Sequence, residues 1–129
     1  MRARLPTREQ CTNVPGMAVE FRKDGITAYI KVDGRLSHGP NLEDFRARWT
    51  SAVASGCTQI IVDLSNVPTI DSSGMGNLVR CKAALDKEGG TMKIVGARAS
   101  ILHALSLIRL DTMFEFYPDE NTAAASFAK

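Results

Sequence analysis

Residues 71–76 read Asp-Ser-Ser-Gly-Met-Gly and bring together two hydroxyls, a carboxylate and two glycines. A serine hydroxyl can attack an electrophile when a base lies within hydrogen-bonding reach, and it can also accept a phosphate from a kinase. The same residue types can be purely structural, because Asp or Ser at a helix start accepts hydrogen bonds from unpaired backbone amides. Capping accounts for one of the three polar side chains but not for a second hydroxyl. The stretch is therefore a candidate functional site as well as a candidate helix start.

The residues on either side of this stretch predict where it lies in the fold. Residues 60–62 are a short β-branched run, which is typical of a strand covered on both faces by helices. After the stretch, apolar residues recur at helical spacing until the glycine pair at 89–90, which predicts a helix over residues 72–87. In parallel sheets, functional groups gather where the carboxyl ends of strands lead into helices. Residues 71–76 occupy such a position.

The residues before that strand predict a hairpin and a helix. Apolar residues alternate over 17–21 and over 26–32 on either side of Asp24-Gly25, which is typical of two antiparallel strands joined by a two-residue turn. Asn41 can cap the helix that follows it, in which apolar residues recur every three or four positions until Gly56.

The last third of the chain continues the alternation of strands and helices. The pattern predicts a strand over 92–95, a helix over 101–108, a strand over 114–117 and a last helix capped by Asp119. The predicted order is β-β-α-β-α-β-α-β-α. An opening hairpin followed by such alternation indicates an α/β fold, with a mixed sheet, right-handed crossovers and about four helices.

Length and charge fit one small domain. The 129 residues, of which 44% are hydrophobic, are enough for one ordinary globular unit. Residues 1–15 show no sustained period, so we expect a flexible leader there and one domain over residues 16–129. The leader's Arg and Glu residues account for the whole net charge of +2. Positive and negative charges therefore balance in the domain itself. This balance disfavours direct nucleic-acid binding, which needs clustered unpaired basic residues.

Several other classes of protein are disfavoured by what the sequence lacks. No apolar run approaches the roughly 20 residues that span a bilayer, and no signal peptide is recognisable, so we expect a cytoplasmic protein without membrane insertion. Its three cysteines are widely spaced and are expected to be reduced. Hydrolase and phosphate-loop glycine motifs are absent, and we expect no metal, no cofactor and no enzymatic activity. Only His38 and His103 could serve a serine nucleophile as an imidazole base.

Residues 60–76 read Ile-Ile-Val-Asp-Leu-Ser-Asn-Val-Pro-Thr-Ile-Asp-Ser-Ser-Gly-Met-Gly. This stretch resembles the signature of the STAS domain family, and specifically that of its bacterial anti-sigma factor antagonists. The likeness continues through the hairpin end at 33–36, the glycine pair at 89–90 and the stretch at 110–114. It extends from about residue 17 to residue 127. The resemblance implies a single STAS-like domain.

The resemblance also implies a phosphorylation switch at Ser72. In such antagonists the hydroxyl residue directly after the Asp accepts phosphate from a serine kinase that doubles as the anti-sigma factor. The dephosphorylated antagonist binds that kinase and releases the sigma factor, the phosphorylated form does not bind, and a serine phosphatase resets the cycle. We expect a monomer or weak dimer whose partner-binding residues are Arg35, Ser37, His38, Asp71, Ser73, Gly74, Met75 and Gly76.

Each expected contact residue in 71–76 has a predicted role. Asp71 is expected to orient the hydroxyl or the loop, and Ser73 to support the cap. Gly74 and Gly76 are expected to let the kinase approach the backbone closely. Met75 is flexible and apolar, so it can be part of the contact surface or of the core.

One loop departs from the family pattern. Antagonists often carry Gly-Glu-Leu-Asp after the second strand, whereas this chain has Arg35 and Ser37 at the two acidic positions. In the family that loop lies beside the phosphorylation loop. The change at Arg35 and Ser37 therefore leaves undetermined which kinase this chain would bind. His38 in the same loop is expected to be an ordinary exposed histidine. The alternative function is a STAS scaffold subunit of a stress-sensing complex or of a membrane transport complex, without a phosphorylation cycle.

Overall fold

The computed structural model describes residues 19–37 and 39–127, and within them it confirms the predicted mixed α/β fold and element order. Five strands form one sheet in the order β1-β2-β3-β4-β5, in which β1 and β2 are antiparallel and the other neighbours are parallel. The elements are β1 (Val19–Asp24), β2 (Thr27–Asp33), α1 (Pro40–Ala54), β3 (Gln59–Asn66), α2 (Ser72–Lys87), β4 (Thr91–Val95), α3 (Ala99–Leu107), the short 3₁₀ helix η2 (Leu110–Thr112), β5 (Glu115–Tyr117) and α4 (Glu120–Phe127).

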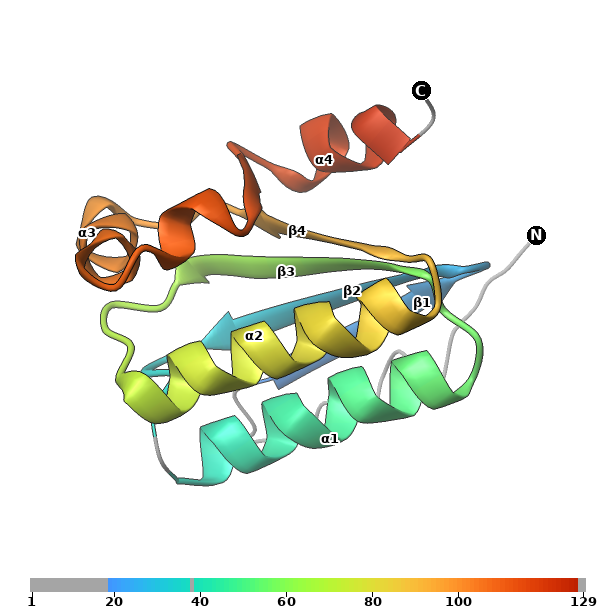
Figure 1. Cartoon of the computed structure of the whole chain (residues 1–129). Coiled ribbons are helices and arrows are strands. Elements are labelled where there is room, and N and C mark those ends of the chain that lie inside the picture. The colour runs from blue at the N-terminus through green and yellow to red at the C-terminus, as the bar shows by residue number, and fades with distance from the viewer. Residues whose placement is uncertain (1–18, 38, 128–129) are drawn as a thin grey trace.

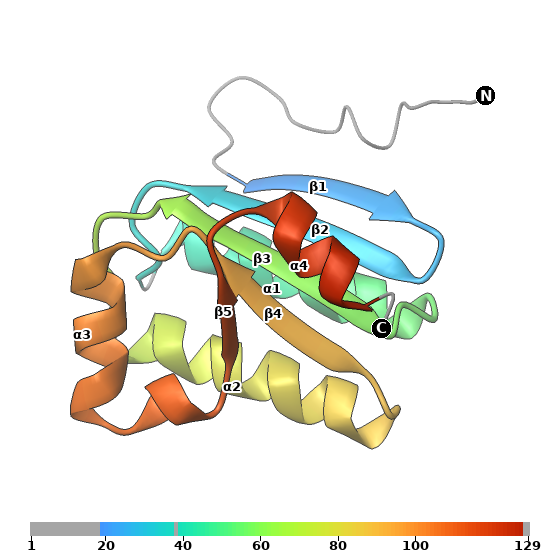
Figure 2. The ribbon, with the colours of Figure 1, turned by 90° about the horizontal axis from the view of Figure 1, so that it is seen from above.

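The sheet has helices on both faces. Helices α1 and α2 lie side by side on one face and run in the same direction, so both begin at the end of the sheet toward which β3 points (Figure 1). Helix α4 lies on the other face, and α3 lies beyond the end of β3 (Figure 2). The main core is packed between the sheet and the first two helices, and its largest fully buried side chains include Phe45, Ile30, Leu36, Leu64 and Leu78. The predicted leader over residues 1–15 lies outside the described residues and stays a prediction.

The hairpin loop lies one residue later than predicted. Asp24 pairs with Thr27, so the two loop residues are Gly25 and Ile26. Gly25 has a φ of 63°, which suits the first position of a tight hairpin turn. Ile26 is consequently a loop residue that is 54% exposed, whereas the alternation over 26–32 predicts it as part of the second strand.

The start of α1 also differs from the prediction. The N-cap residue is Gly39 and Pro40 is the first helical residue, so the helix begins before Asn41. Proline is favourable there because its fixed φ suits a helix and its missing N–H would have had no partner. Asn41 does not cap the helix; its amide Nδ2 instead donates to the backbone oxygen of Arg35 at 3.1 Å.

Helix α4 is fixed to the sheet by a buried lysine. Lys93 on β4 is 5% exposed, and its Nζ lies 3.5 Å from a carboxylate oxygen of Glu115. The ammonium also lies 4.3 Å from the ring centre of Phe127 and 5.0 Å from that of Tyr117, and it donates to the hydroxyl of Ser126. Two of these four partners belong to α4, so the lysine joins the helix to β4 and β5.

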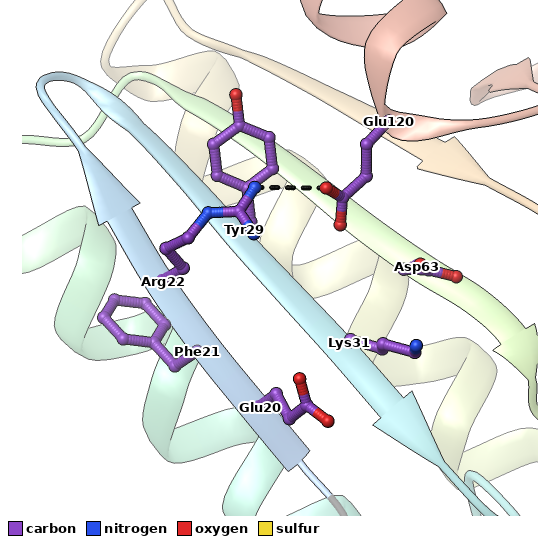
Figure 3. A pocket seen from close by; sticks show the side chains of 7 residues that line it. All are labelled: Glu20, Phe21, Arg22, Tyr29, Lys31, Asp63 and Glu120. Carbon is purple, nitrogen blue, oxygen red and sulfur yellow. Dashed lines mark hydrogen bonds and ion pairs between the residues drawn. The ribbon is translucent and has the colours of Figure 1, made fainter. Parts of the chain in front are cut away.

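Part of the α4 face of the sheet is uncovered and forms a hollow of about 410 Å³ (Figure 3). Arg22 of β1 reaches across to Glu120 at 3.1 Å and stacks over the ring of Tyr29. Three further charged side chains alternate in sign across the strands, because Glu20 lies opposite Lys31 and Lys31 lies opposite Asp63. The hollow therefore balances most of its own charge, and it lies on the face opposite α1 and α2.

Candidate functional site

The loop between β3 and α2 is held by the segment that follows β2. Gly34 N donates to Asn66 O at 2.9 Å, and Leu36 N donates to Thr69 O at 3.1 Å. Leu36 is fully buried and forms an isolated parallel bridge with Ile70. These contacts confirm that the loop after the second strand lies beside the loop that leads to α2.

Asp71 caps α2, as the sequence predicts for one of the three polar residues. Its backbone is extended, and its Oδ1 accepts a hydrogen bond from Gly74 N at 2.9 Å. The carboxylate thereby satisfies one of the amides that a helix start leaves unpaired. Because Asp71 makes the cap, the hydroxyls of Ser72 and Ser73 are not required for it.

Ser72 is the first residue of α2, and its side chain is exposed. Among the described residues, its hydroxyl makes no hydrogen bond. Ser73 is half-buried, and its backbone oxygen accepts from Asn77 Nδ2 at 3.3 Å. Asn77 Oδ1 in turn accepts from Trp49 Nε1 of α1 at 3.4 Å, which ties the two helices together. Ser72 is thus accessible, and no hydrogen bond within the described residues ties its hydroxyl to the fold.

The two glycines of the motif have different roles. Gly74 is buried, and a Cβ atom at this position would lie 2.2 Å from Leu36 O and 2.8 Å from Ile70 Cγ1. The missing side chain of Gly74 makes room for a neighbouring loop of the same chain, and the expected close approach by a kinase stays a prediction. Gly76 is half-buried, and a Cβ atom there would meet nothing within 4 Å. Only Gly76 leaves open space for a partner.

The other predicted contact residues differ in how far they are exposed. Met75 is half-buried and packs against the main core, which is the more structural of the two predicted roles. Arg35 is exposed and Ser37 is half-buried, in the segment that bonds to the loop before α2. His38 lies outside the described residues.

An open groove of about 390 Å³ lies between α1 and α2 and includes the candidate serines. Five of its residues are not among the predicted site residues, Arg46 and Arg80 included. Arg80 follows Ser72 and Gly76 at intervals of four, which places all three on one stripe of α2 and was a usable signal. Nothing in the sequence signals Arg46, because α1 reaches the groove only through tertiary packing. The lining residues are Leu42, Glu43, Arg46, Ser72, Ser73, Gly76, Asn77 and Arg80.

Among the described residues, no histidine or cysteine lines the groove. Within the described part of the chain, no group of three or more His, Cys, Asp or Glu residues could hold a metal ion. His103 is exposed on α3 and does not line the groove. The thiol of Cys81 on α2 faces the core, and burial raises its pKa from 9.0 to about 12, which keeps it in the unreactive thiol form. Within the described residues, no helix combines the length and the apolar character that crossing a membrane requires.

One known family model matches most of the chain. The family model described as the STAS domain matches residues 18–123, a span that includes the whole sheet, the capped helix start and the groove. The chain therefore belongs to the STAS domain family. Its described elements from β1 to β5 all fall inside the matched range.

Several solved structures share this architecture at low sequence identity. The Thermotoga maritima protein TM1081, a candidate anti-sigma factor antagonist, is 20% identical with a TM-score of 0.79, over 86% of this chain and 95% of that one. SpoIIAA from Bacillus, in its phosphorylated form, is 20% identical with a TM-score of 0.69, over 87% of this chain and 100% of that one. A sulfate transporter family protein from Wolinella succinogenes is 16% identical with a TM-score of 0.66, over 80% and 85%. At these identities the similarity shows the fold alone.

Proposed function

We propose that this STAS domain is an anti-sigma factor antagonist, switched by phosphorylation at Ser72. In its dephosphorylated form it binds an anti-sigma factor with serine kinase activity and so releases the sigma factor. Phosphorylation by that kinase ends the binding, and a serine phosphatase restores it. The protein acts by binding, in the cytoplasm, without catalysis of its own.

The observation that carries the proposal is the accessible hydroxyl of Ser72. The purely structural interpretation of the motif needs a helix cap, and Asp71 provides it through its bond to Gly74. Ser72 remains exposed, and within the described residues its hydroxyl makes no hydrogen bond. An accessible serine without a structural role can be modified while the fold stays intact. The solved structures of SpoIIAA in unphosphorylated and phosphorylated forms have the same architecture as this chain and agree with such a role.

The electrostatics at Ser72 suit a switch in binding without refolding. A phosphate adds about −1.5 to −2 charges at neutral pH. At the start of α2 this anion gains roughly 0.3–1 kcal/mol from the helix dipole, so the folded domain tolerates it. A partner that closes over Ser72 has to remove water from the phosphate beside the Asp71 carboxylate. This desolvation costs several kcal/mol unless the partner supplies a cation.

An enzymatic role for Ser72 is less well supported. A nucleophilic serine needs a base within hydrogen-bonding reach. In the described structure the polar side chains that line the groove are amide, hydroxyl, guanidinium and carboxylate groups, with no imidazole among them. We therefore expect esterase activity near background, and turnover that is lost in Ser72→Ala would contradict the proposal.

A scaffold role is the second candidate. It is favoured by the similarity to the sulfate transporter family protein and by Arg35 and Ser37, which replace acidic residues of the antagonist pattern. A scaffold subunit would bind its partner equally well whether or not Ser72 carries a phosphate. Phosphorylation dependence of binding therefore distinguishes the two functions.

The test uses ATP and the anti-sigma serine kinase of the same organism. We expect one phosphate per chain, located at Ser72 by phosphopeptide mapping. Ser72→Ala should stay unmodified and bind the kinase constitutively, whereas Ser72→Asp should bind weakly. Ser73→Ala is the matched control, because it removes the neighbouring hydroxyl and should be phosphorylated like the wild type. Equal affinity of the kinase for all four proteins would overturn the proposal.

A further inference from the structure

The groove beside Ser72 contains two arginines that nothing in the described chain neutralises. Arg46 comes from α1 and Arg80 from α2, and both side chains are exposed. Neither guanidinium has a hydrogen bond or an ion pair within the described residues, whereas Arg48 on α1 is paired with Asp44 at 3.3 Å. Of the described residues that line the groove, Glu43 alone is acidic. The groove therefore has an excess of positive charge.

The spacing on α2 leaves room for an anionic group in front of these cations. Ser72, Gly76 and Arg80 follow one another at intervals of four and so lie on one face of the helix. Side chains in helices lean toward the N-terminus, which brings Arg80 back toward Gly76. A Cβ atom at Gly76 would meet nothing within 4 Å, so the space between Ser72 and Arg80 is open. Arg46 borders the same space from α1.

We propose that this groove binds an acidic segment of the protein partner, with carboxylates of the partner paired to Arg46 and Arg80. The proposal rests on the proposed function, since it assumes the anti-sigma kinase as the partner. Charge complementarity identifies the partner's chemistry, because two unpaired guanidiniums in one groove form strong bonds with carboxylates. The positive charge of the groove also explains why a domain whose total charge is balanced can bind selectively, since the excess of positive charge is confined to this groove.

The same groove gives the phosphorylation switch a second component. A phosphate on Ser72 is a dianionic group at the mouth of the groove, with three acceptor oxygens suited to guanidinium. It competes with the partner's carboxylates for Arg46 and Arg80 and repels them. The phosphate therefore weakens binding by occupying the site of attraction, in addition to the cost of its own desolvation.

The first test removes one positive charge at a time. Arg46→Gln and Arg80→Gln should each weaken kinase binding about tenfold, and the dependence of log Kd on log salt concentration should become less steep. Lys87→Gln is the matched control, because Lys87 is an exposed cation in the last turn of the same helix and should leave the affinity within about twofold. Thermal unfolding should show a cooperative transition for all three variants, which establishes that they are folded. Unchanged affinity in both arginine variants would overturn the proposal.

The second test measures the coupling between the arginines and Ser72. The loss of affinity caused by Ser72→Asp should be at least about fivefold smaller in the Arg46→Gln, Arg80→Gln double variant than in the wild type. Equal losses in both backgrounds would contradict competition for the arginines. This failure differs from failure of the proposed function. If Ser72→Asp binds the kinase as tightly as the wild type in the unmodified chain, the switch itself is wrong, whatever the arginines do.

Discussion

Replacement of Gly74 by alanine should destabilise the domain through one well-defined contact. An added Cβ atom would lie 2.2 Å from Leu36 O and 2.8 Å from Ile70 Cγ1. The first of these atoms belongs to a backbone that is itself bonded on both sides, since Leu36 N donates to Thr69 O and Leu36 O accepts from Asp71 N. The clash therefore cannot be relieved by a side-chain rotation, and the loop after β2 has to move away from α2.

The size of the effect follows from the cost of adding atoms to a packed site. Such insertions cost about 1–3 kcal/mol, and a backbone obstacle places Gly74→Ala near the upper value. Gly76→Ala is the matched control on the same helix, because a Cβ atom there meets nothing within 4 Å. Alanine is a better helix former than glycine, so Gly76→Ala should stabilise the domain by about 0.5–1 kcal/mol. The two substitutions should thus change stability in opposite directions.

Urea unfolding at pH 7, followed by circular dichroism and by the fluorescence of Trp49, measures both effects. We expect a lower midpoint for Gly74→Ala and a higher one for Gly76→Ala, with unchanged slopes. A free energy of unfolding for Gly74→Ala equal to that of the wild type would refute the close packing of α2 against Leu36. Destabilisation by Gly76→Ala would refute the open space in the groove.

Three further predictions test other parts of the fold. Because burial raises the pKa of the Cys81 thiol to about 12, the unfolded chain loses this proton first as the pH rises above 9.0. The free energy of unfolding should therefore fall more steeply in the wild type than in Cys81→Ala between about pH 9 and 12, and parallel curves would contradict this. Lys93→Ala should cost about 2 kcal/mol and speed amide exchange in α4, whereas unchanged exchange would show that Lys93 does not hold the helix. Asp71→Ala should cost about 1 kcal/mol and Asp71→Asn much less, and equal losses in thermal unfolding would argue against the cap at Gly74.

Much of the fold could be predicted because its elements have strong local signals. The helix over 72–87 has both its bounds as predicted, since an Asp at the start and a glycine pair after the end act within a few residues. The predicted cap by Asp119 is also present, because its Oδ1 accepts from Thr122 N at 2.8 Å, and this bond contributes to lowering the pKa of the carboxyl. At α1 two local signals competed, and Pro40 determined the helix start in place of Asn41.

The candidate site could be predicted only in part, because it is built from segments far apart in the sequence. The motif at 71–76 was found from its residue types. The role of Gly74 depends on the carbonyl of Leu36, and the sequence does not show which atom lies opposite a glycine. Arg46 enters the groove because α1 packs parallel to α2 on the same face of the sheet (Figure 1). Helical periodicity indicates which side of α1 is buried but not which neighbour lies beside its exposed residues.

The most direct test of the account is the affinity of the anti-sigma kinase for the stoichiometrically phosphorylated chain. Isothermal titration should compare it with the unmodified chain and with Ser72→Ala treated with kinase and ATP in the same way. We predict that phosphorylation raises Kd at least about a hundredfold, equivalent to about 2.8 kcal/mol, and that the treated Ser72→Ala binds like the unmodified chain. The same Kd for the phosphorylated and unmodified chains, or an equal loss in Ser72→Ala, would contradict the switch at Ser72.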